Sequence, residues 1–133
     1  LLEAGLIDYL AITKLGVSDF CVSNAYVFLI GAYAAMWLGG KWCRGFDSLT
    51  LRNAAQRFAA MAIATSVAFL ISNGSFYWLS GRHLETSWTQ YADGFATYYP
   101  PYLTTTLIYG IVIFGLVAGT KALLAAKHTR EAV

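Results

Sequence analysis

Charge is scarce in this sequence of 133 residues: charged side chains make up 12% of the chain, and the formal net charge is only +2. So small an excess of Lys and Arg does not form a nucleic-acid-binding surface, which needs a concentrated basic patch. Cysteine is scarce as well. Cys21 and Cys43 flank an apolar stretch that, as a helix, would hold them ~30 Å apart, whereas a disulfide needs Cα atoms within ~7 Å. The sequence therefore excludes a bridge between them within one chain.

No catalytic signature stands within the apolar stretches. The two histidines, His83 and His128, lie in connections on opposite sides of the last apolar stretch, so they cannot hold a haem between them. His83 with Glu85 lacks the further ligands that a zinc site needs. The sequence has no glycine-rich phosphate loop, no nucleophile–histidine–acid set and no ionised residue in the core of an apolar stretch, which disfavours enzymes and ion pumps. We expect a protein that is not an enzyme and has no metal or cofactor.

Long apolar runs are what the sequence has in abundance. Hydrophobic residues make up 58% of it, and its mean hydropathy is +0.55. Three runs are almost free of charge: Phe20–Gly40, Phe58–Leu79 and Tyr102–Ala126. A helix needs roughly 20 apolar residues to cross ~30 Å of hydrocarbon, and a single segment in lipid satisfies its backbone hydrogen bonds only as a helix. The sequence therefore predicts an all-α integral membrane protein, a single domain over residues 1–133 with three transmembrane helices at about 20–40, 58–79 and 102–126.

The positions of Lys and Arg predict the orientation in the membrane. Basic residues gather in the first connection and after the last apolar run: Lys41, Arg44, Arg52 and Arg57, then Lys121, Lys127 and Arg130. The first connection carries one acid, Asp47, and the second connection, residues 80–101, carries only one basic residue, Arg82. By the positive-inside bias, the first connection and the C-terminus are cytoplasmic, and the second connection faces outward. We expect a multi-pass protein of a bacterial inner membrane.

Residues 1–19 predict a helix of another kind. Four residues recur at helical spacing and three charges interrupt them: Leu2, Leu6, Tyr9 and Thr13, against Glu3, Asp8 and Lys14. The uninterrupted apolar part is too short to span a bilayer, which favours an interfacial or re-entrant helix. The segment also lacks the basic start and the small-residue exit of a signal peptide.

Polar and aromatic residues concentrate at the predicted outer ends of the three spans, whereas the inner halves are mostly Ala, Gly, Leu, Ile and Val. Amides and hydroxyls that face lipid are costly, so these groups should point into the bundle and bond each other or a ligand. Aromatic walls with a few converging hydrogen-bonding groups are the usual form of a small-molecule site. The candidate ligand-binding residues are Asn24, Ser72, Asn73, Ser75, Trp78, Tyr98 and Thr105.

Structural roles, rather than ligand binding, also explain many of these polar and aromatic residues. Tyr and Trp at this depth form an aromatic belt in most membrane proteins, and Ser and Thr often join closely packed helices. Asn73 is less easily explained in this way, because an amide within a span needs a partner, either another helix or a ligand. The segment Ser72–Ser75 also predicts a local break in the helix, where backbone groups would be exposed.

A short helix is expected in the outer loop. Ser87 and Gln90 have the spacing of a capping box, and Gly94 is suited to end the helix. One face of the segment is aromatic: Trp88, Tyr91 and Phe95. The pair Pro100-Pro101 should then prevent helix until the third span begins at Tyr102. Lying flat, this short helix would form either a lid over the polar layer or an interfacial helix that rests on lipid headgroups.

Small residues give each predicted span a face suited to close helix contact. They are Gly31, Ala35 and Gly39 in the first, Ala60, Ala64 and Ala68 in the second, and Gly115 and Gly119 in the third. Three helices cannot hide all of these faces, so we expect the chain to be part of a larger bundle or complex. Its partners are then the lipid bilayer and other membrane subunits, with a small-molecule ligand in the outer layer.

Several motifs together resemble a known group of proteins. They are Val17-Ser18-Asp19-Phe20, the stretch from Ile71-Ser72-Asn73-Gly74 through Trp78, and Tyr98–Leu103 before a glycine-containing last span. Over roughly Val17 to Leu123 the chain is similar to an uncharacterised bacterial membrane family grouped with the substrate-binding S components of energy-coupling factor (ECF) vitamin and metal transporters. S components are six-helix proteins whose ligand site opens outward between helix ends and loops.

The resemblance implies an outward-facing ligand site, but the sequence predicts three spans where six are expected. The early helix that carries the family's small-residue contact with the transporter core is absent. Because the first residue is Leu rather than Met, one explanation is that the N-terminal half lies outside this sequence. The other is a reduced relative with a different use.

Two hypotheses therefore stand. In the first, the chain captures a small molecule in the outer polar layer, as an S-component-like part of an ATP-driven uptake transporter. In the second, it is a non-catalytic accessory subunit of a larger membrane complex, in which the same residues pack against other helices.

Overall fold

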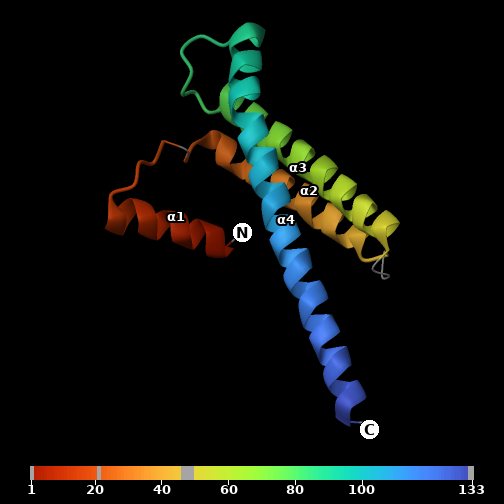
Figure 1. Cartoon of the computed structure of the whole chain (residues 1–133). Coiled ribbons are helices and arrows are strands. Elements are labelled where there is room, and N and C mark those ends of the chain that lie inside the picture. The colour runs from red at the N-terminus through yellow and green to blue at the C-terminus, as the bar shows by residue number, and fades with distance from the viewer. Residues whose placement is uncertain (1, 21, 46–49, 132–133) are drawn as a thin grey trace.

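The computed structural model describes residues 2–20, 22–45 and 50–131, with side chains as far as Lys127, and this part of the chain is helical without any strand. The elements follow in the order α1 (Leu2–Leu15), the 3-10 helix η1 (Asn24–Phe28), α2 (Leu29–Cys43), α3 (Leu51–Leu79) and α4 (Trp88–Glu131). Figure 1 shows α2 and α3 as an antiparallel hairpin, with α4 running beside it. Cys21, Asp47 and the side chains of His128 and Arg130 lie outside the described residues, as do the expectations that rest on them.

Two of these helices are long and apolar enough to cross a membrane. They are α3, with 29 residues and a mean hydropathy of 1.5 in its most apolar window, and the Trp88–Lys127 part of α4, with a mean hydropathy of 2.0. The expected spans at 58–79 and 102–126 lie within them. The first expected span is shorter: α2 has 15 residues, and five residues of η1 precede it directly.

The hairpin of α2 and α3 is held by small residues. A Cβ added to Gly39 would lie 2.5 Å from Ala64 Cβ, so glycine is needed for the helices to approach this closely. Gly31 similarly faces Ile71, with 3.4 Å between an added Cβ and Cγ2. The core is made chiefly of the α3 residues at this contact: Ala60, Ala64, Thr65 and Ala68. The small-residue face expected in the first span is thus covered by α3 of the same chain.

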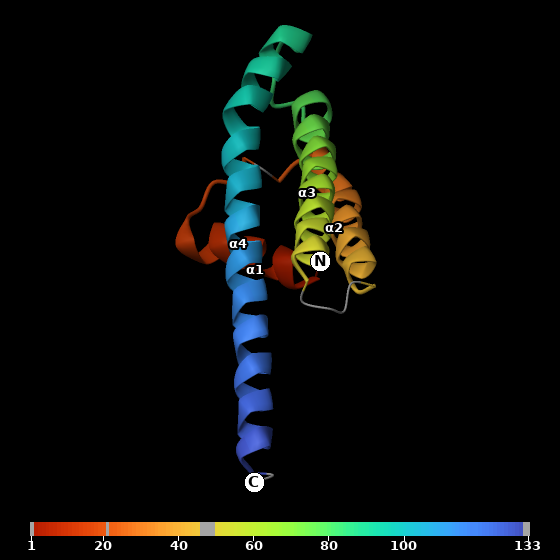
Figure 2. The same cartoon turned by 45° about the vertical axis from the view of Figure 1, so that its right-hand side comes forward.

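On another side of α3, aromatic side chains pack against α4. Phe69 contacts three rings of α4, those of Phe95, Tyr99 and Tyr102, with centroids 5.1–5.5 Å apart. The hydroxyls of Ser66 and Tyr99 are 2.7 Å apart. Further along, Met61 lies against Gly110, where an added Cβ would clash with the methionine side chain. α3 is therefore the central element, and Figure 2 shows α4 and α2 on its two sides.

The helix α4 is continuous through Pro100 and Pro101, which corrects the expectation of a separate loop helix and of a break before Tyr102. Proline has a φ suited to helix, and its cost is one missing N–H bond and crowding of the carbonyl four residues earlier, which bends a helix without ending it. Figure 1 shows this bend in the teal part of α4. The expected loop helix is the first part of α4, and it stands along the end of α3 rather than flat.

A helix at the N-terminus is present as expected, as α1. It ends at Gly16, which has φ +66, and the Val17 N–H donates to the Ala11 carbonyl at 3.2 Å. None of its residues is buried, and Figures 1 and 2 show it lying crosswise to α3 and α4. Tyr26 Oη donates to Asp8 Oδ2 at 2.6 Å and so joins α1 to η1.

Candidate functional site

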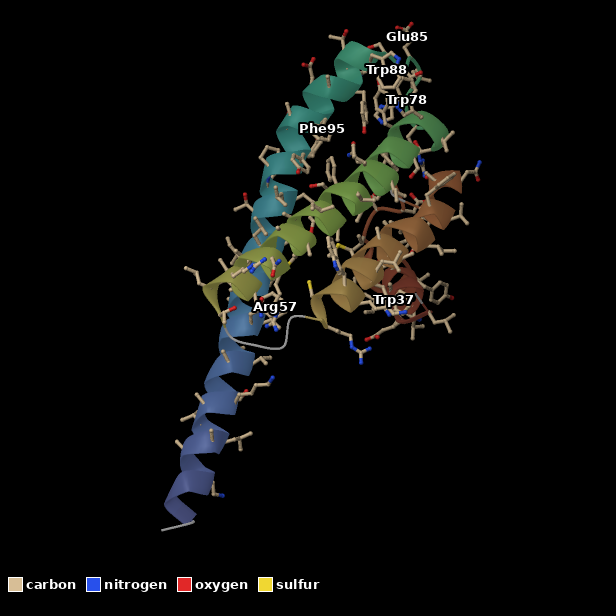
Figure 3. The ribbon with its side chains drawn as sticks, turned by 90° about the vertical axis from the view of Figure 1, so that its right-hand side faces the viewer. Trp37, Arg57, Trp78, Glu85, Trp88 and Phe95 are labelled. Atoms are coloured by element: carbon tan, nitrogen blue, oxygen red, sulfur yellow. The ribbon has the colours of Figure 1, made fainter. Side chains whose placement is uncertain are left out.

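A groove runs between the C-terminal end of α3 and the first half of α4. It consists of two open cavities of about 660 and 630 Å³, which share Asn73, Phe76 and Tyr98, and we call it the Asn73 groove. The first cavity is closed on its far side by Phe20 and His83, and the second continues along α4 past Tyr102 and Thr105. Figure 3 shows this aromatic end of the molecule, marked by Trp78, Trp88 and Phe95, opposite the end that carries Arg57.

The wall that α4 contributes is fixed at its start by Ser87 and Tyr77. Ser87 Oγ accepts from the Gln90 N–H at 3.2 Å, which is the N-cap bond expected from the sequence. The Ser87 N–H donates to Tyr77 Oη at 2.9 Å, so the tyrosine takes the place that Gln90 holds in a full capping box. The Tyr77 hydroxyl has one proton and two acceptors in reach, Ser87 O at 3.0 Å and Gln90 Oε1 at 2.9 Å. Tyr77 is buried, and these bonds tie the end of α3 to the first turn of α4.

Ring contacts continue this attachment into the groove. Tyr77 packs against Tyr91 at 5.3 Å and against His83 at 4.7 Å between centroids. Gly74 makes room for Tyr91, since an added Cβ would lie 3.4 Å from its hydroxyl. The pair Trp78–Trp88, at 4.9 Å, closes the outer side. Aromatic pairs of this kind contribute ~0.5–1.5 kcal/mol each beyond their buried area, so the wall is a stable one.

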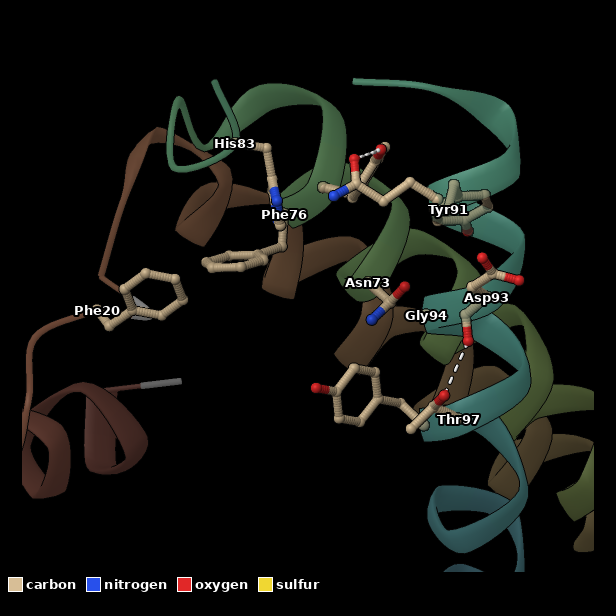
Figure 4. A pocket seen from close by; sticks show the side chains of 11 residues that line it. Phe20, Asn73, Phe76, His83, Tyr91, Asp93, Gly94 and Thr97 are labelled. Carbon is tan, nitrogen blue, oxygen red and sulfur yellow. Dashed lines mark hydrogen bonds between the residues drawn. The ribbon is translucent and has the colours of Figure 1, made fainter. Parts of the chain in front are cut away.

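Asn73 lines the groove from α3. It is half-buried, and its amide makes no hydrogen bond to any residue that the structure describes. Figure 4 shows Asn73 on α3 and Asp93 on α4, both among the residues that line the first cavity. Asp93 is the one carboxylate among the residues that line this cavity, and no Lys or Arg lines it. Thr97 Oγ1 donates to the Asp93 backbone carbonyl at 2.9 Å, which leaves the carboxylate oxygens available.

The N-terminal segment forms the remaining side. Arg82 donates to the carbonyls of Asp19 and Val22 at 3.4 and 3.5 Å, and its guanidinium lies 5.4 Å from the centre of the Phe20 ring. These contacts hold Phe20 at the groove, where it packs against Phe76 at 5.5 Å. Arg82 is therefore occupied in positioning the wall.

The candidate residues named from the sequence separate into two groups. Asn73 and Tyr98 line both cavities, and Ser72 and Thr105 line the second. The other three lie elsewhere: Asn24 is exposed on η1, Ser75 bonds within its own helix, and Trp78 packs on Trp88. The expected layer does not lie at one depth. Tyr102 lies against Phe69, whereas Trp78, nine residues further along α3, lies against Trp88 at the start of α4.

The expected break at Ser72–Ser75 is not present, since α3 is helical from Leu51 to Leu79. Ser72 Oγ donates to the Phe69 carbonyl at 3.3 Å, and Ser75 Oγ donates to the Ser72 carbonyl at 3.1 Å. Such bonds from serine to the preceding turn satisfy the hydroxyls inside the helix. The segment therefore offers side chains to the groove, with its backbone in the helix.

Sequence reasoning missed the contribution of the second connection. His83, considered from the sequence only as a haem or zinc ligand, is half-buried against Tyr77 and lines the first cavity. The same cavity is lined by Gln90, Tyr91, Asp93 and Thr97. The signal was the capping serine at the start of α4, because a helix that begins at Trp88 and turns its aromatic face to α3 places these residues beside Asn73.

Of the glycines that the sequence predicts at helix contacts, some lie against another helix of this chain and some do not. Gly31 and Gly39 face α3, with Ala35 half-buried between them, whereas Gly115 and Gly119 have no atom within 4 Å of an added Cβ. Gly110, which the sequence analysis did not single out, is the glycine that α4 uses against α3. The face of α4 that carries Gly115 and Gly119 is therefore open.

Within the described part of the chain, no three His, Cys, Asp or Glu side chains lie close enough together to hold a metal ion. Comparison with known proteins gives no matching family model and no matching curated protein.

Proposed function

We propose that this chain is a multi-pass membrane protein that captures a small molecule in the Asn73 groove, as an S-component-like part of an ATP-driven uptake transporter. The single observation that carries the proposal is the half-buried Asn73 amide, which has no partner among the described residues and faces an aromatic groove. An unpaired amide at such a depth costs free energy, and a bound ligand removes that cost.

Three membrane crossings are supported by the lengths of the helical segments. Along α3, Arg57 and Trp78 are about 32 Å apart at ~1.5 Å per residue, which matches the hydrocarbon thickness with a basic residue at one boundary and an aromatic one at the other. The five residues of η1 and the 15 of α2 together reach ~32 Å, at ~2.0 and ~1.5 Å per residue. In this proposal η1 and α2 cross as one segment, although α2 alone is too short.

The orientation rests on the basic residues. Lys41 and Arg44 at the end of α2, Arg52 and Arg57 at the start of α3, and Lys121 in the last part of α4 lie toward one end of the bundle. That end is cytoplasmic by the positive-inside bias, and the Asn73 groove then opens outward. The C-terminus is cytoplasmic, in a bacterial inner membrane.

The chemistry of the groove defines the kind of ligand. Phe20, Phe76 and Tyr98 present ring faces, which suit a flat or apolar ligand body. Asn73 Oδ1 and the Asp93 carboxylate are acceptors, and no Lys or Arg is among the described residues that line the first cavity. We therefore expect a small molecule with a ring or a comparable apolar part and with hydrogen-bond donors, such as an amine or amide.

The experiment is to identify what the purified protein carries. The chain is purified in lipid nanodiscs and denatured, and the released small molecules are compared by mass spectrometry for wild type, Asn73→Leu and Asn24→Leu. Asn24 is the matched control, because it is an amide in the same predicted layer that lies outside the groove. A compound retained by wild type and Asn24→Leu but lost from Asn73→Leu supports capture in the groove, and equal recovery from all three proteins contradicts it.

The second function, a non-catalytic accessory subunit of a larger membrane complex, is favoured by the exposure of α4. Only 6% of its most apolar window is buried, against 28% for α3. Identification of the proteins that co-purify separates the two functions: an ATPase supports the uptake transporter, and a complex without any ATPase supports the accessory subunit.

A further inference from the structure

A second, smaller cavity lies at the opposite end of the α3–α4 pair. It measures about 210 Å³ and is lined by Arg57 and Phe58 of α3 and by Phe114, Val117 and Lys121 of α4, with two alanines. The Phe58 and Phe114 rings meet edge to face at 5.7 Å and close the cavity on the side toward the Asn73 groove. Figure 3 shows Arg57 at this inner end of α3, beside the blue part of α4. The cavity therefore has an apolar floor and a basic rim.

The two basic side chains at the rim have no acidic partner among the residues that the structure describes. No carboxylate lines the cavity, and neither the Arg57 guanidinium nor the Lys121 ammonium forms an ion pair with a residue that the structure describes. Arg57 is half-buried in this position. Two positive charges from neighbouring helices at one mouth attract an anion, and Arg presents the planar donors that suit phosphate oxygens.

The surface beside the cavity identifies the source of that phosphate. The nearby face of α4 is apolar and exposed, with Ile113 57%, Leu116 65% and Val117 47% exposed. A free phosphate would leave this surface uncovered, whereas the acyl chains of a phospholipid cover it while the headgroup reaches the basic rim. Basic cavities between transmembrane helices at the cytoplasmic side are typical sites for anionic headgroups.

We infer that Arg57 and Lys121 bind the phosphate of an anionic phospholipid, whose acyl chains lie along the exposed face of α4. The site is separate from the Asn73 groove and depends on membrane insertion but not on ligand capture. It holds one lipid at the cytoplasmic boundary and fills the space between the inner ends of α3 and α4.

The test measures retention of phosphatidylglycerol by native mass spectrometry of the detergent-purified chain, with phosphatidylcholine of the same acyl chains as the neutral comparison. Each near-surface cation contributes a factor of about five to the attraction of an anionic lipid, so Arg57→Gln with Lys121→Gln should weaken phosphatidylglycerol binding about 25-fold. The matched control is Lys41→Gln with Arg44→Gln, which removes the same charge from the same end of the molecule but not from the cavity.

Four further results bear on the lipid site. Charge-preserving exchange, Arg57→Lys with Lys121→Arg, should retain most of the binding and shows that loss in the first variant is not a folding defect. Equal loss in the two Gln double variants, or equal retention of phosphatidylcholine, would overturn a specific lipid site. If inorganic phosphate stabilises the chain as much as phosphatidylglycerol does, the phosphate at the site need not come from a lipid, and the lipid assignment would be overturned.

Discussion

At the scale of single residues, the glycines show where backbone contact matters. Gly39 lies against Ala64, and Gly110 lies against Met61, while Gly119 has open space around its Cα. A Cβ added at Gly39 therefore meets a rigid neighbour, one added at Gly110 meets a flexible side chain, and one added at Gly119 meets no described atom.

Gly39→Ala should lower the free energy of unfolding by about 1–3 kcal/mol, because the new Cβ meets Ala64 Cβ at 2.5 Å and neither helix can yield without moving its backbone. Gly119→Ala, the matched control, should raise the stability of the isolated chain by up to ~1 kcal/mol through helix propensity. Gly110→Ala should fall between them, since the Met61 side chain can move aside. Thermal unfolding in detergent measures all three, and a Gly39 variant as stable as wild type would contradict the α2–α3 contact.

Tyr77→Phe tests the attachment of α4 to α3. Removal of the hydroxyl leaves the Ser87 N–H and the Gln90 side chain without their partner, at an expected cost of about 1–3 kcal/mol. Tyr98→Phe is the control, because Tyr98 is 62% exposed and its hydroxyl makes no bond to a described residue. Unfolding midpoints should separate the two variants, and the same midpoint for both would mean that the hydroxyl network contributes little.

At the scale of elements, the bend at Pro100 and Pro101 decides the form of the groove. The missing N–H groups leave the carbonyls four residues earlier without their helical donors, and the crowding turns the first part of α4. This part carries Asp93 and Tyr98, so the bend positions one wall of the Asn73 groove.

Pro100→Ala with Pro101→Ala should therefore straighten α4. Spin labels at Thr89 and Ile113 should move toward the ~36 Å expected for 24 residues of straight helix, as measured by electron double resonance. A label pair at Ile113 and Leu124, both on the far side of the prolines, is the control and should keep its distance. An unchanged Thr89–Ile113 distance would show that packing on α3, rather than proline, sets the direction.

At the scale of the whole molecule, the number of crossings is decided by η1 and α2. Two crossings by α3 and α4 alone would leave Ser18 on the same side as Arg44, whereas a third crossing separates them.

In a background with Cys21→Ala and Cys43→Ala, a membrane-impermeant thiol reagent applied from outside should label Ser18→Cys and Asp93→Cys but not Arg44→Cys. Labelling of Asp93→Cys alone would reduce the protein to two crossings. Labelling of Arg44→Cys alone would reverse the orientation and turn the Asn73 groove to the cytoplasm.

The open face of α4 leads to the last prediction. Gly115→Leu with Gly119→Leu adds bulk at two levels where no described residue of this chain lies close, so the chain should stay folded while any partner helix is displaced. Co-purification from native membranes measures this loss. The corresponding change in α2, Gly31→Leu with Gly39→Leu, should instead unfold the α2–α3 hairpin. A stable monomer in nanodiscs that is active by itself would contradict a partner at α4.

The sequence by itself determined the helical class, the two long apolar helices, the N-terminal helix and the N-cap at Ser87, because these depend on local hydrophobicity and hydrogen bonding. It also singled out Asn73, because an amide within an apolar run needs a partner, and Asn73 lies at the groove. That Asn73 and Tyr98 bind a ligand stays a prediction. The small residues at Gly31 and Gly39 predicted a close contact, and that contact is present.

Only the tertiary structure decided which surfaces meet. Gly39 packs on α3 while Gly119 stays open, which depends on which helices meet. That α4 continues through two prolines, and that His83 and Asp93 line the same cavity as Asn73, depend on how α4 lies against α3. Helix continuity at proline is a balance between a local cost and the packing of Phe95, Tyr99 and Tyr102 on Phe69. The local cost of proline can be inferred from the sequence. The packing energy exists only once segments far apart in sequence are in contact.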